Sequence, residues 1–224
     1  MSKKIVFKYT SRSRPDNFFR GLRSIIDNCV DNNYEVLCSF DEDDKSMNNP
    51  FEIGGLGAFD KVIFYFGTSN SKISAINNDL DKLPKDWGIL INMSDDMVFI
   101  EKGFDNLIRK AFEVNFPNGD GFLHIHDGCQ NRLATMSIID KKHFDRFGYI
   151  YHPDFKSVYV DNFHQEYAQK HGCYHYMGDN VRLIEHLHPL HKQGIPMDAQ
   201  YVENEKLYDH DREVYYRIRK EYNL

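Results

Sequence analysis

The sequence predicts an α/β domain built on a mostly parallel sheet. In its first hundred residues, short apolar runs typical of buried strands alternate with segments whose apolar residues recur every three or four positions, as in amphipathic helices. Each of the four strands predicted there ends in a polar or charged segment. The 224 residues contain no internal repeat and no low-complexity linker, so we expect one domain with a helical C-terminal tail.

The elements of the first half are the clearest. Residues 4–9 form a short β-rich apolar run, and Pro15 begins a helix at a position that proline favours. Further elements are a strand at 34–40, a loop at 50–59, a strand at 61–66, a helix at 71–80 and a strand at 87–92. The loop contains the glycine-rich run at 54–57, which comes before a strand and lacks the Lys-Ser/Thr of a P-loop. We therefore interpret it as a flexible loop.

The second half is less regular. Helices are expected at 104–112, 141–147 and 162–171, strands at 121–126, 135–139, 158–160 and 182–187, and a charged helical tail at 198–222. We accordingly divide the chain into a domain at 1–195 and a tail at 196–224.

The composition describes a globular protein that is not strongly basic. Lys and Arg number 28 against 34 Asp and Glu, a net charge of −6, which argues against a general nucleic-acid-binding surface. The four cysteines show no CxxC spacing, so neither a zinc ribbon nor a disulfide framework is expected. No apolar run is long enough for a signal peptide or a transmembrane helix. We expect a cytoplasmic protein, in the host cytoplasm if a phage encodes it.

Polar side chains gather directly after the first four predicted strands. These segments are 10–14, 41–44, 67–70 and 94–96. In open α/β sheets, ligands bind outside the carboxyl ends of the strands, and parallel strands bring those ends to one edge. The sequence therefore predicts a ligand cleft at this edge.

Two of these segments are acidic. Asp95 and Asp96 suit a hard cation, Mg²⁺ or Mn²⁺, which completes its shell with phosphate oxygens and water; an acidic turn with Asp95 as a cap is the alternative. The run at 41–44 holds four carboxylates. One of them suits a hydrogen bond to a nucleobase or a ribose hydroxyl, with a cation, Arg12 or Arg14 offsetting the charge. A solvated acidic turn is the alternative there.

Two HxH pairs are candidate metal ligands: His186 with His188, and His124 with His126. Alternation along a strand places both imidazoles of a pair on one face, and His suits Mn²⁺ or Zn²⁺. Because the chain contains 11 His, hydrogen-bonded strand residues are the alternative for either pair.

Asp161 stands just before a predicted helix. A carboxylate at a helix start that faces a cleft can act as a general base for a hydroxyl. The alternative is an N-cap, which accepts backbone hydrogen bonds and gains from the helix dipole.

In their order and spacing, these segments resemble a GT-A-type glycosyltransferase, most like the inverting family 2 pattern, over roughly residues 4–190. The resemblance implies a GT-A-like (Rossmann-like) fold, a nucleotide-sugar donor and a divalent cation, Mn²⁺ or Mg²⁺. It implies nucleotide-sugar binding by residues at the strand ends and at the start of the second helix: Thr10, Arg12, Arg14, Asp41, Asp43, Lys72 and Asp95. It implies Asp96 and His188 as metal ligands, with His186 as second choice, and Asp161 as the catalytic base.

The resemblance further implies direct displacement at the anomeric carbon, with a UDP-sugar as the expected donor. Residues 1–100 then form the nucleotide-binding half and residues 101–195 the acceptor-binding half. The acceptor is a glycan hydroxyl or, as the alternative, a hydroxymethylated base in phage DNA. Basic residues in the tail favour DNA, whereas the net charge of −6 argues against it.

Two other functions compete with this interpretation. A metal-dependent hydrolase would use both HxH pairs, although amidohydrolase-like chains place HxH after their first strand and need a larger barrel. The second is a module that binds a nucleotide sugar or a glycan without turning it over.

Overall fold

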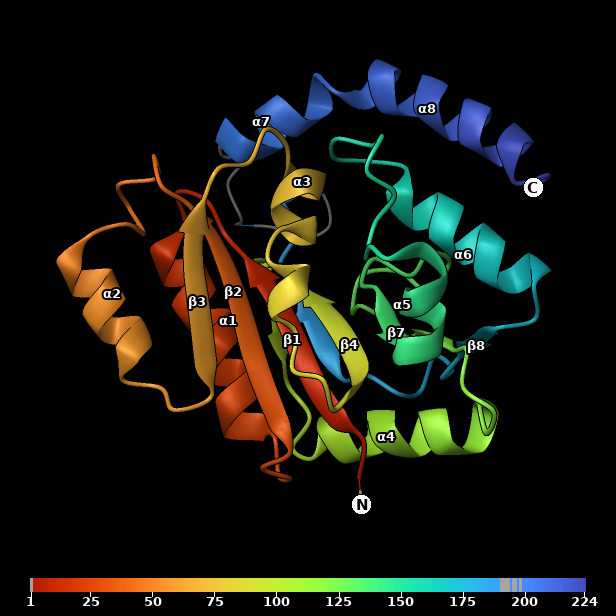
Figure 1. Cartoon of the computed structure of the whole chain (residues 1–224), viewed down its shortest axis with the longest axis horizontal. Helices are drawn as coiled ribbons and strands as arrows, with labels where there is room; N and C mark the ends of the chain where they lie inside the picture. Colours follow the sequence, from red (N-terminus) through yellow and green to blue (C-terminus); the bar gives the residue numbers. More distant parts are fainter. Residues whose placement is uncertain (1, 190–193, 195–196, 198) are drawn as a thin grey trace.

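A seven-stranded sheet forms the centre of the molecule, in the order β3-β2-β1-β4-β7-β6-β8 (Figure 1). The computed structural model describes residues 2–189, 194, 197 and 199–224. The strands are β1 (Lys4–Thr10), β2 (Tyr34–Asp41), β3 (Val62–Gly67), β4 (Trp87–Met93), β6 (Phe122–His124), β7 (Ile138–Asp140) and β8 (Tyr174–Tyr176). β3, β2, β1 and β4 pair in parallel, β7 is antiparallel to both its neighbours, and β6 and β8 are parallel. The expected mostly parallel α/β fold is confirmed.

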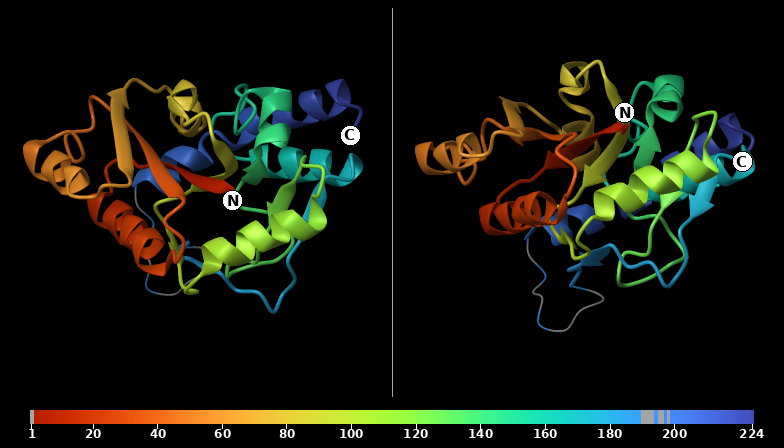
Figure 2. Two further views of the ribbon diagram at one scale, coloured as in Figure 1. Left: turned by 60° about the horizontal axis from the view of Figure 1, so that its bottom comes forward. Right: turned by 90° about the horizontal axis from the view of Figure 1, so that it is seen from below.

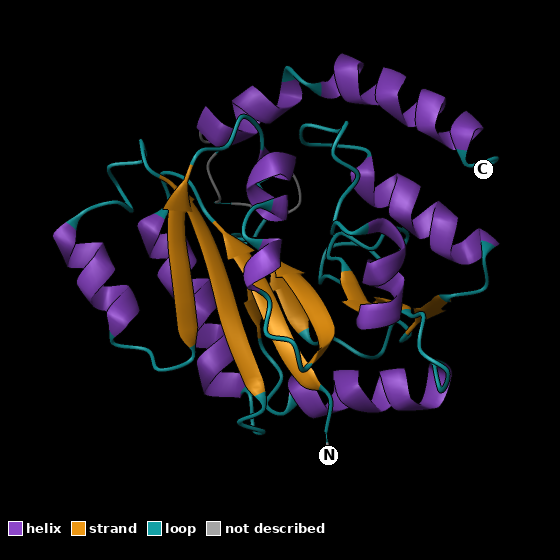
Figure 3. Ribbon diagram, in the orientation of Figure 1, coloured by secondary structure: helices purple, strands orange, loops and turns teal. Residues whose placement is uncertain are grey.

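Helices cover both faces of the sheet, as Figures 2 and 3 show. They are α1 (Pro15–Asn28), α2 (Pro50–Gly57), α3 (Lys72–Asn77), α4 (Phe104–Asn115), α5 (Lys141–Phe147), α6 (Val160–Lys170), α7 (Ala199–Glu205) and α8 (Tyr208–Glu221). Within the described residues, no helix is long and apolar enough to cross a membrane.

The core has two layers because alternate residues of each strand point to opposite faces. Ile5 and Phe7 of β1 pack with the apolar sides of α1 and α4 in one buried cluster. Val6, between them, packs in a second cluster with residues of α3, α6 and α8. All three β1 side chains are fully buried. A strand that is apolar on both faces is what a central parallel strand requires.

The segment expected to be a loop at 50–59 is instead largely a helix, α2. The side-chain oxygen of Asn49 accepts hydrogen bonds from the backbone N–H groups of Phe51 and Glu52, and Pro50 occupies the first turn. Three glycines lower the helix propensity of this segment, which is why the sequence favoured a loop. The cap, the proline and the burial of Leu56 compensate for them.

Other elements of the second half also differ from expectation. The prediction of a strand at 158–160 is wrong, because Tyr159 adopts a left-handed φ of 61° and α6 begins at the next residue. The strand expected at 182–187 is β9 (Ile184–His186), which leaves the main sheet and pairs antiparallel with the unexpected short strand β5 (Met97–Phe99). The strands expected at 121–126 and 135–139 are β6 and β7, each three residues long, and β8 was not expected.

The helical tail expected at 198–222 consists of two helices, α7 and α8; residue 198 lies outside the described residues. The tail passes along the top of the molecule in the view of Figure 1. Val214, Tyr215 and Ile218 of α8 are buried in the second core cluster. The Tyr215 hydroxyl donates a hydrogen bond to Glu166 of α6.

Asp211 anchors the tail to a loop that precedes α6. Its fully buried carboxylate accepts hydrogen bonds from the backbone N–H groups of Lys156, Ser157 and Val158 at 3.0, 2.7 and 2.8 Å. We expect Asp211→Ala to lower the free energy of unfolding by about 2–4 kcal/mol, because buried donors lose a charged acceptor. Urea unfolding measures this, with the exposed Asp209→Ala as control at within about 0.5 kcal/mol of wild type. Equal losses in both variants would contradict the prediction.

Lys8 gives the fold a dependence on pH. Its side chain is fully buried on β1 and donates to the Ser39 hydroxyl, which in turn donates to Asp79 at 2.5 Å. Burial lowers the pKa of Lys8 to about 8, below the value of about 10.4 in an unfolded chain. Between these values the unfolded chain binds more protons than the folded one, so stability rises with pH.

We expect this group to add about 2 kcal/mol to the free energy of unfolding between pH 7 and about 9.5. Lys8→Met should be more stable than wild type at pH 7 and should lose this part of the rise. Urea unfolding of both proteins at the two pH values measures the difference, and parallel pH profiles would refute the assignment to Lys8.

Candidate functional site

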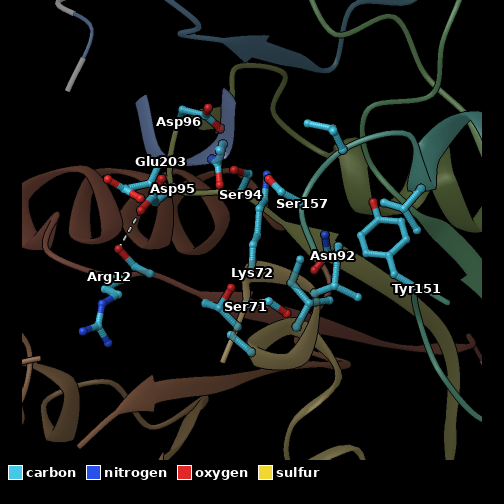
Figure 4. A pocket seen from close by; sticks show the side chains of 18 of the residues that line it. Arg12, Ser71, Lys72, Asn92, Ser94, Asp95, Asp96, Tyr151, Ser157 and Glu203 are labelled. Carbon is cyan, nitrogen blue, oxygen red and sulfur yellow. Dashed lines mark hydrogen bonds between the residues drawn. The ribbon is translucent and has the colours of Figure 1, made fainter. Parts of the chain in front are cut away.

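A cleft of about 1100 Å³ opens at the carboxyl ends of β1, β2 and β4, where the sequence predicted it. Residues from α3, the start of α6 and α7 complete its walls (Figure 4). The cleft contains every candidate site residue: Thr10, Arg12, Arg14, Asp41, Asp43, Lys72, Asp95, Asp96, Asp161 and His188. The individual role expected of each residue stays a prediction.

One wall carries an arginine held by two aspartates. The Arg12 guanidinium donates to Asp41 at 2.7 Å and to both oxygens of Asp43 at 2.7 and 2.9 Å. Ser69 donates to the other oxygen of Asp41 at 2.6 Å. Asp41 is buried and Asp43 is exposed, so Asp41 is the more rigidly held of the two carboxylates.

Asp95 is buried and held by two residues from the loop that follows β1. Ser11 donates to one of its oxygens at 2.6 Å, and Arg14 donates to the other at 3.0 Å. Burial raises the pKa of Asp95, and the charge of Arg14 opposes this shift. Because Ser11 and Arg14 each bind one oxygen, both oxygens of Asp95 already have protein partners.

Within the part of the chain that the structure describes, one oxygen of Asp96 has no partner. The Tyr201 hydroxyl of α7 donates to its Oδ2 at 2.7 Å, and His186 Nε2 lies 3.3 Å from the same atom. Oδ1 is buried and has no hydrogen-bond partner among the described residues. Burial would raise the pKa of Asp96, but the hydrogen bond and charge of His186 hold it well below its usual range. Asp96 is thus an ionised carboxylate with one oxygen available for a ligand.

His186 lies between two carboxylates. Its Nε2 faces Asp96, and its Nδ1 lies 3.3 Å from Oδ2 of Asp127. Burial would lower the pKa of His186, but the hydrogen bonds to Asp127 and Asp96 outweigh it and raise the pKa to about 9. Asp127 is fixed in turn by the backbone N–H groups of Cys129 and Gln130 at 2.8 and 2.7 Å.

The pairing of β5 with β9 determines which histidine meets the carboxylate. Met97 of β5 stands opposite His186 of β9, which brings His186 beside Asp96. His188, the first choice from the sequence, lines the same cleft, and its ring packs against His186 and Tyr201 with centroids 5.2 and 4.9 Å apart. Both histidines of this pair line the cleft and His186 pairs with Asp96, while the choice between them as metal ligand stays a prediction.

Asp161 faces the cleft from the first turn of α6 and does not cap the helix. The N-cap is Tyr159, which makes no side-chain cap hydrogen bond. Burial raises the pKa of Asp161, while the charge of Lys72 and a hydrogen bond from Tyr151 oppose the rise. Lys72 also lowers the pKa of Asp96 through its charge, so it lies within electrostatic reach of both carboxylates. Figure 4 shows its side chain extending toward Ser157 and Ser94.

The other HxH pair does not join the site. His124 lies on β6, where its Nδ1 is 2.6 Å from the Tyr174 hydroxyl and burial lowers its pKa to about 4. His126 accepts a hydrogen bond from the backbone N–H of Gly128 at 2.8 Å. Neither is among the described residues that line the cleft. A hydrolase centre that uses both HxH pairs therefore has no geometric support.

Sequence reasoning missed two side chains that complete the site, Tyr151 and Tyr201, and took Asp127 only as a weak candidate for the acceptor side. Tyr151 lines the cleft and interacts with Asp161 and Asn92. An aspartate directly after the pair at 124–126 was a weak signal for Asp127. No local pattern distinguishes Tyr201 from the other tail tyrosines, because its contact with Asp96 joins residues 105 positions apart.

Comparisons with known proteins add information on the fold. No family model and no curated protein matches the chain. Among solved structures, the mannosyltransferase PcManGT from Pyrobaculum calidifontis, in complex with GDP-Man and Mn²⁺, matches 87% of the chain with a TM-score of 0.66 at 11% identity. TarS 1–349 from S. aureus, in complex with UDP, matches 81% with a TM-score of 0.63 at 10% identity.

The chain spans about 59% of the mannosyltransferase and 60% of TarS 1–349. A third structure, 4-diphosphocytidyl-2C-methyl-D-erythritol synthase from Anaerococcus prevotii, matches 92% of the chain and is itself covered to 96%, with a TM-score of 0.57 at 10% identity. At these identities the likeness concerns the fold alone. The protein has a GT-A-like α/β fold, shared with solved glycosyltransferases, with a helical C-terminal region.

Proposed function

We propose that this protein is a glycosyltransferase that moves a sugar from a nucleotide sugar to an acceptor hydroxyl. The observation that carries the proposal is the cleft itself. It combines Asp96, which has an available buried oxygen, with Asp161, whose pKa is raised. The fold supports it, because the solved neighbours include a mannosyltransferase with GDP-Man and TarS with UDP.

The residues around Asp96 fit a divalent cation, Mn²⁺ or Mg²⁺. Oδ1 of Asp96 is buried without a partner, and His186 Nε2 lies beside the same carboxylate. Asp96 would hold the ion together with His186, which would give up its Nε2 proton on binding, and His188 lines the same cleft. Once bound, such a cation stabilises negative charge on the leaving diphosphate. Carboxylate and imidazole ligands suit Mn²⁺ better than Mg²⁺, which prefers oxygen.

The chain's own residues then have separable roles. Arg12, fixed between Asp41 and Asp43, positions the two carboxylates for the base and ribose of the donor. Lys72 and Arg14 provide positive charge for the diphosphate. Thr10 and Asp95 border the same part of the cleft.

Asp161 accepts the proton of the acceptor hydroxyl as its oxygen attacks the anomeric carbon. A new C–O bond to the acceptor forms while the bond between the anomeric carbon and the diphosphate oxygen breaks, and the electron pair leaves with the diphosphate. Direct displacement inverts the anomeric configuration. A carboxylate with a raised pKa suits this role, because a base is most effective when its pKa approaches the working pH.

We keep a UDP-sugar as the proposed donor and a glycan hydroxyl as the acceptor, with a hydroxymethylated DNA base as the alternative. The division into a nucleotide-binding half at 1–100, an acceptor-binding half at 101–195 and a tail at 196–224 is part of the same proposal, as is the cytoplasmic location.

A second candidate function is nucleotidyl transfer. The diphosphocytidyl synthase is covered almost entirely by this chain, which the longer glycosyltransferases are not. Such an enzyme would join a nucleotide to a phosphorylated acceptor and release pyrophosphate. It would need a nucleoside triphosphate as donor, whereas the glycosyltransferase releases a nucleoside diphosphate.

A thermal-shift panel separates these possibilities. UDP, GDP, CMP, ADP and CTP are each added with and without Mn²⁺, followed by UDP- and GDP-sugars with assays for released diphosphate and pyrophosphate. A ligand at 100 times its Kd stabilises the folded protein by about 2.7 kcal/mol. Stabilisation by one diphosphate that requires Mn²⁺, with turnover of the matching sugar donor, supports the proposal. Pyrophosphate release from CTP, or binding without turnover of any donor, overturns it.

A further inference from the structure

A group of three side chains of metal-binding types lies at the opposite end of the strands from the cleft. Asp120 lies two positions before β6, and Cys173 lies one position before β8. His143 lies in the first turn of α5, just after β7. β6 runs in the same direction as β4 because both are antiparallel to β7. The amino ends of β6 and β8 therefore lie away from the strand ends that form the cleft.

The three side chains converge on a common point. One ligand atom from each of Asp120, His143 and Cys173 lies within 4.8 Å of the others. His143 Nδ1 is 3.4 Å from Asp120 Oδ1, a long contact, and neither atom makes a hydrogen bond of good geometry with a described residue. In a tetrahedral zinc site with bonds of about 2.0–2.3 Å, neighbouring ligand atoms are about 3.3–3.8 Å apart. The imidazole and the carboxylate already have this separation.

The described residues offer the buried imidazole no close, well-oriented hydrogen bond, and its nearest partner is Asp120 at 3.4 Å. His143 is only 1% exposed, and both of its ring nitrogens lack hydrogen-bond partners among the described residues. Leaving buried polar atoms unpaired is costly, and such atoms call for an explanation. Arg146 binds Oδ2 of Asp120, so that Oδ1 faces His143 without a well-oriented donor among the described residues. Two of the three ligands therefore present unused atoms toward the same point.

The chemistry of the donors selects the cation. One imidazole, one thiol and one carboxylate form a mixed set of nitrogen, sulfur and oxygen, which suits Zn²⁺, whereas Mg²⁺ and Ca²⁺ prefer oxygen alone. On binding, the Cys173 thiol would give its proton to solvent and bind as thiolate. A cavity of about 230 Å³ lined by Asp120 and Cys173 gives water access to a fourth position.

We propose that Asp120, His143 and Cys173 form a zinc site that links the amino ends of β6 and β8 to α5. The ligands come from three segments that are 23 and 30 residues apart along the chain, so a bound ion would cross-link the acceptor-side part of the sheet. The site is independent of the proposed glycosyl transfer. Its role is structural, because it lies at the end of the strands away from the cleft.

Cobalt substitution tests this site by a signal that only a thiolate ligand produces. The full-length protein is treated with a chelator, dialysed, and titrated with Co²⁺ alone. We expect a thiolate-to-cobalt charge-transfer band in the near ultraviolet, whose intensity saturates at one equivalent of Co²⁺. The visible absorption bands of four-coordinate cobalt should appear with it. Zn²⁺ should displace the cobalt and remove these bands. Absence of a charge-transfer band would overturn the proposal.

Matched variants locate the signal. Cys173→Ser should abolish the charge-transfer band, whereas Cys29→Ser, which changes a partly buried thiol elsewhere in the fold, should keep it. Asp120→Asn, which retains the thiol and the shape of the side chain, should weaken Co²⁺ binding at least about tenfold. Asp96→Asn should leave the band intact, which separates this site from the cleft. A band that persists in Cys173→Ser, or cobalt affinity unchanged in a folded Asp120→Asn protein, would contradict the assignment.

Discussion

An Asp161→Asn variant should lose glycosyl transfer by about 10²–10⁴-fold while its binding of the nucleotide remains nearly unchanged. Asparagine has almost the same shape but cannot accept the proton of the acceptor hydroxyl. Asp161 does not cap α6, so the substitution should not expose unsatisfied backbone groups at the helix start. Burial raises the pKa of this carboxyl, so the neutral side chain is tolerated at this place.

The measurement combines turnover of the donor with the nucleotide thermal shift. Asp145→Asn is the matched control, because Asp145 is exposed on α5 and pairs with Lys141 on the same helix. The control should retain full turnover. Loss of nucleotide binding or of folding in Asp161→Asn would indicate a structural role instead. Normal turnover in that variant would remove Asp161 from the mechanism.

Asp96→Asn should abolish the Mn²⁺-dependent part of nucleotide binding and reduce transfer by about 10²–10³-fold, because charge stabilisation by a bound cation is worth several kcal/mol. The free oxygen of Asp96 is the buried atom without a partner, and an amide lacks the negative charge that a cation requires. The variant also leaves His186 with Asp127 as its remaining carboxylate partner.

Tyr201→Phe is the companion variant for this experiment. It removes the donor to Oδ2 of Asp96 but leaves Oδ1, so binding of Mn²⁺ should persist. The readout is the thermal shift produced by nucleotide with and without Mn²⁺ in each protein. An undiminished Mn²⁺-dependent thermal shift in Asp96→Asn would place the cation elsewhere. Loss of this shift in both variants would show that it depends on the contact between Tyr201 of the tail and Asp96.

The sequence alone determined the α/β class and the position of the cleft. Buried strands are short and apolar on both faces, and their periodicity is a local property that the residues reveal directly. Parallel strands then bring their carboxyl ends to one edge, so polar segments far apart in sequence had to meet there. This is why residues as distant as Arg12, after β1, and Asp96, after β4, lie in one cleft.

The sequence could not decide among neighbours that share the same local pattern. His186 and His188 both suit a metal site, and the β5–β9 pairing alone brings His186 to Asp96. The glycine content of α2 pointed to a loop, but a cap and the packing of Leu56 stabilise a helix there. Tertiary contacts overrode a weak local propensity in that case.

Only the tertiary structure assembled the contacts between distant segments. The three ligands of the proposed zinc site have no common motif, and they meet because β6, β7 and β8 are neighbours in the sheet. Tyr201 reaches Asp96, and Asp211 holds the loop at 156–158, because the tail folds back over the sheet. Periodicity records which face of an element is buried, but not which other element covers it, and that choice depends on packing across the whole chain.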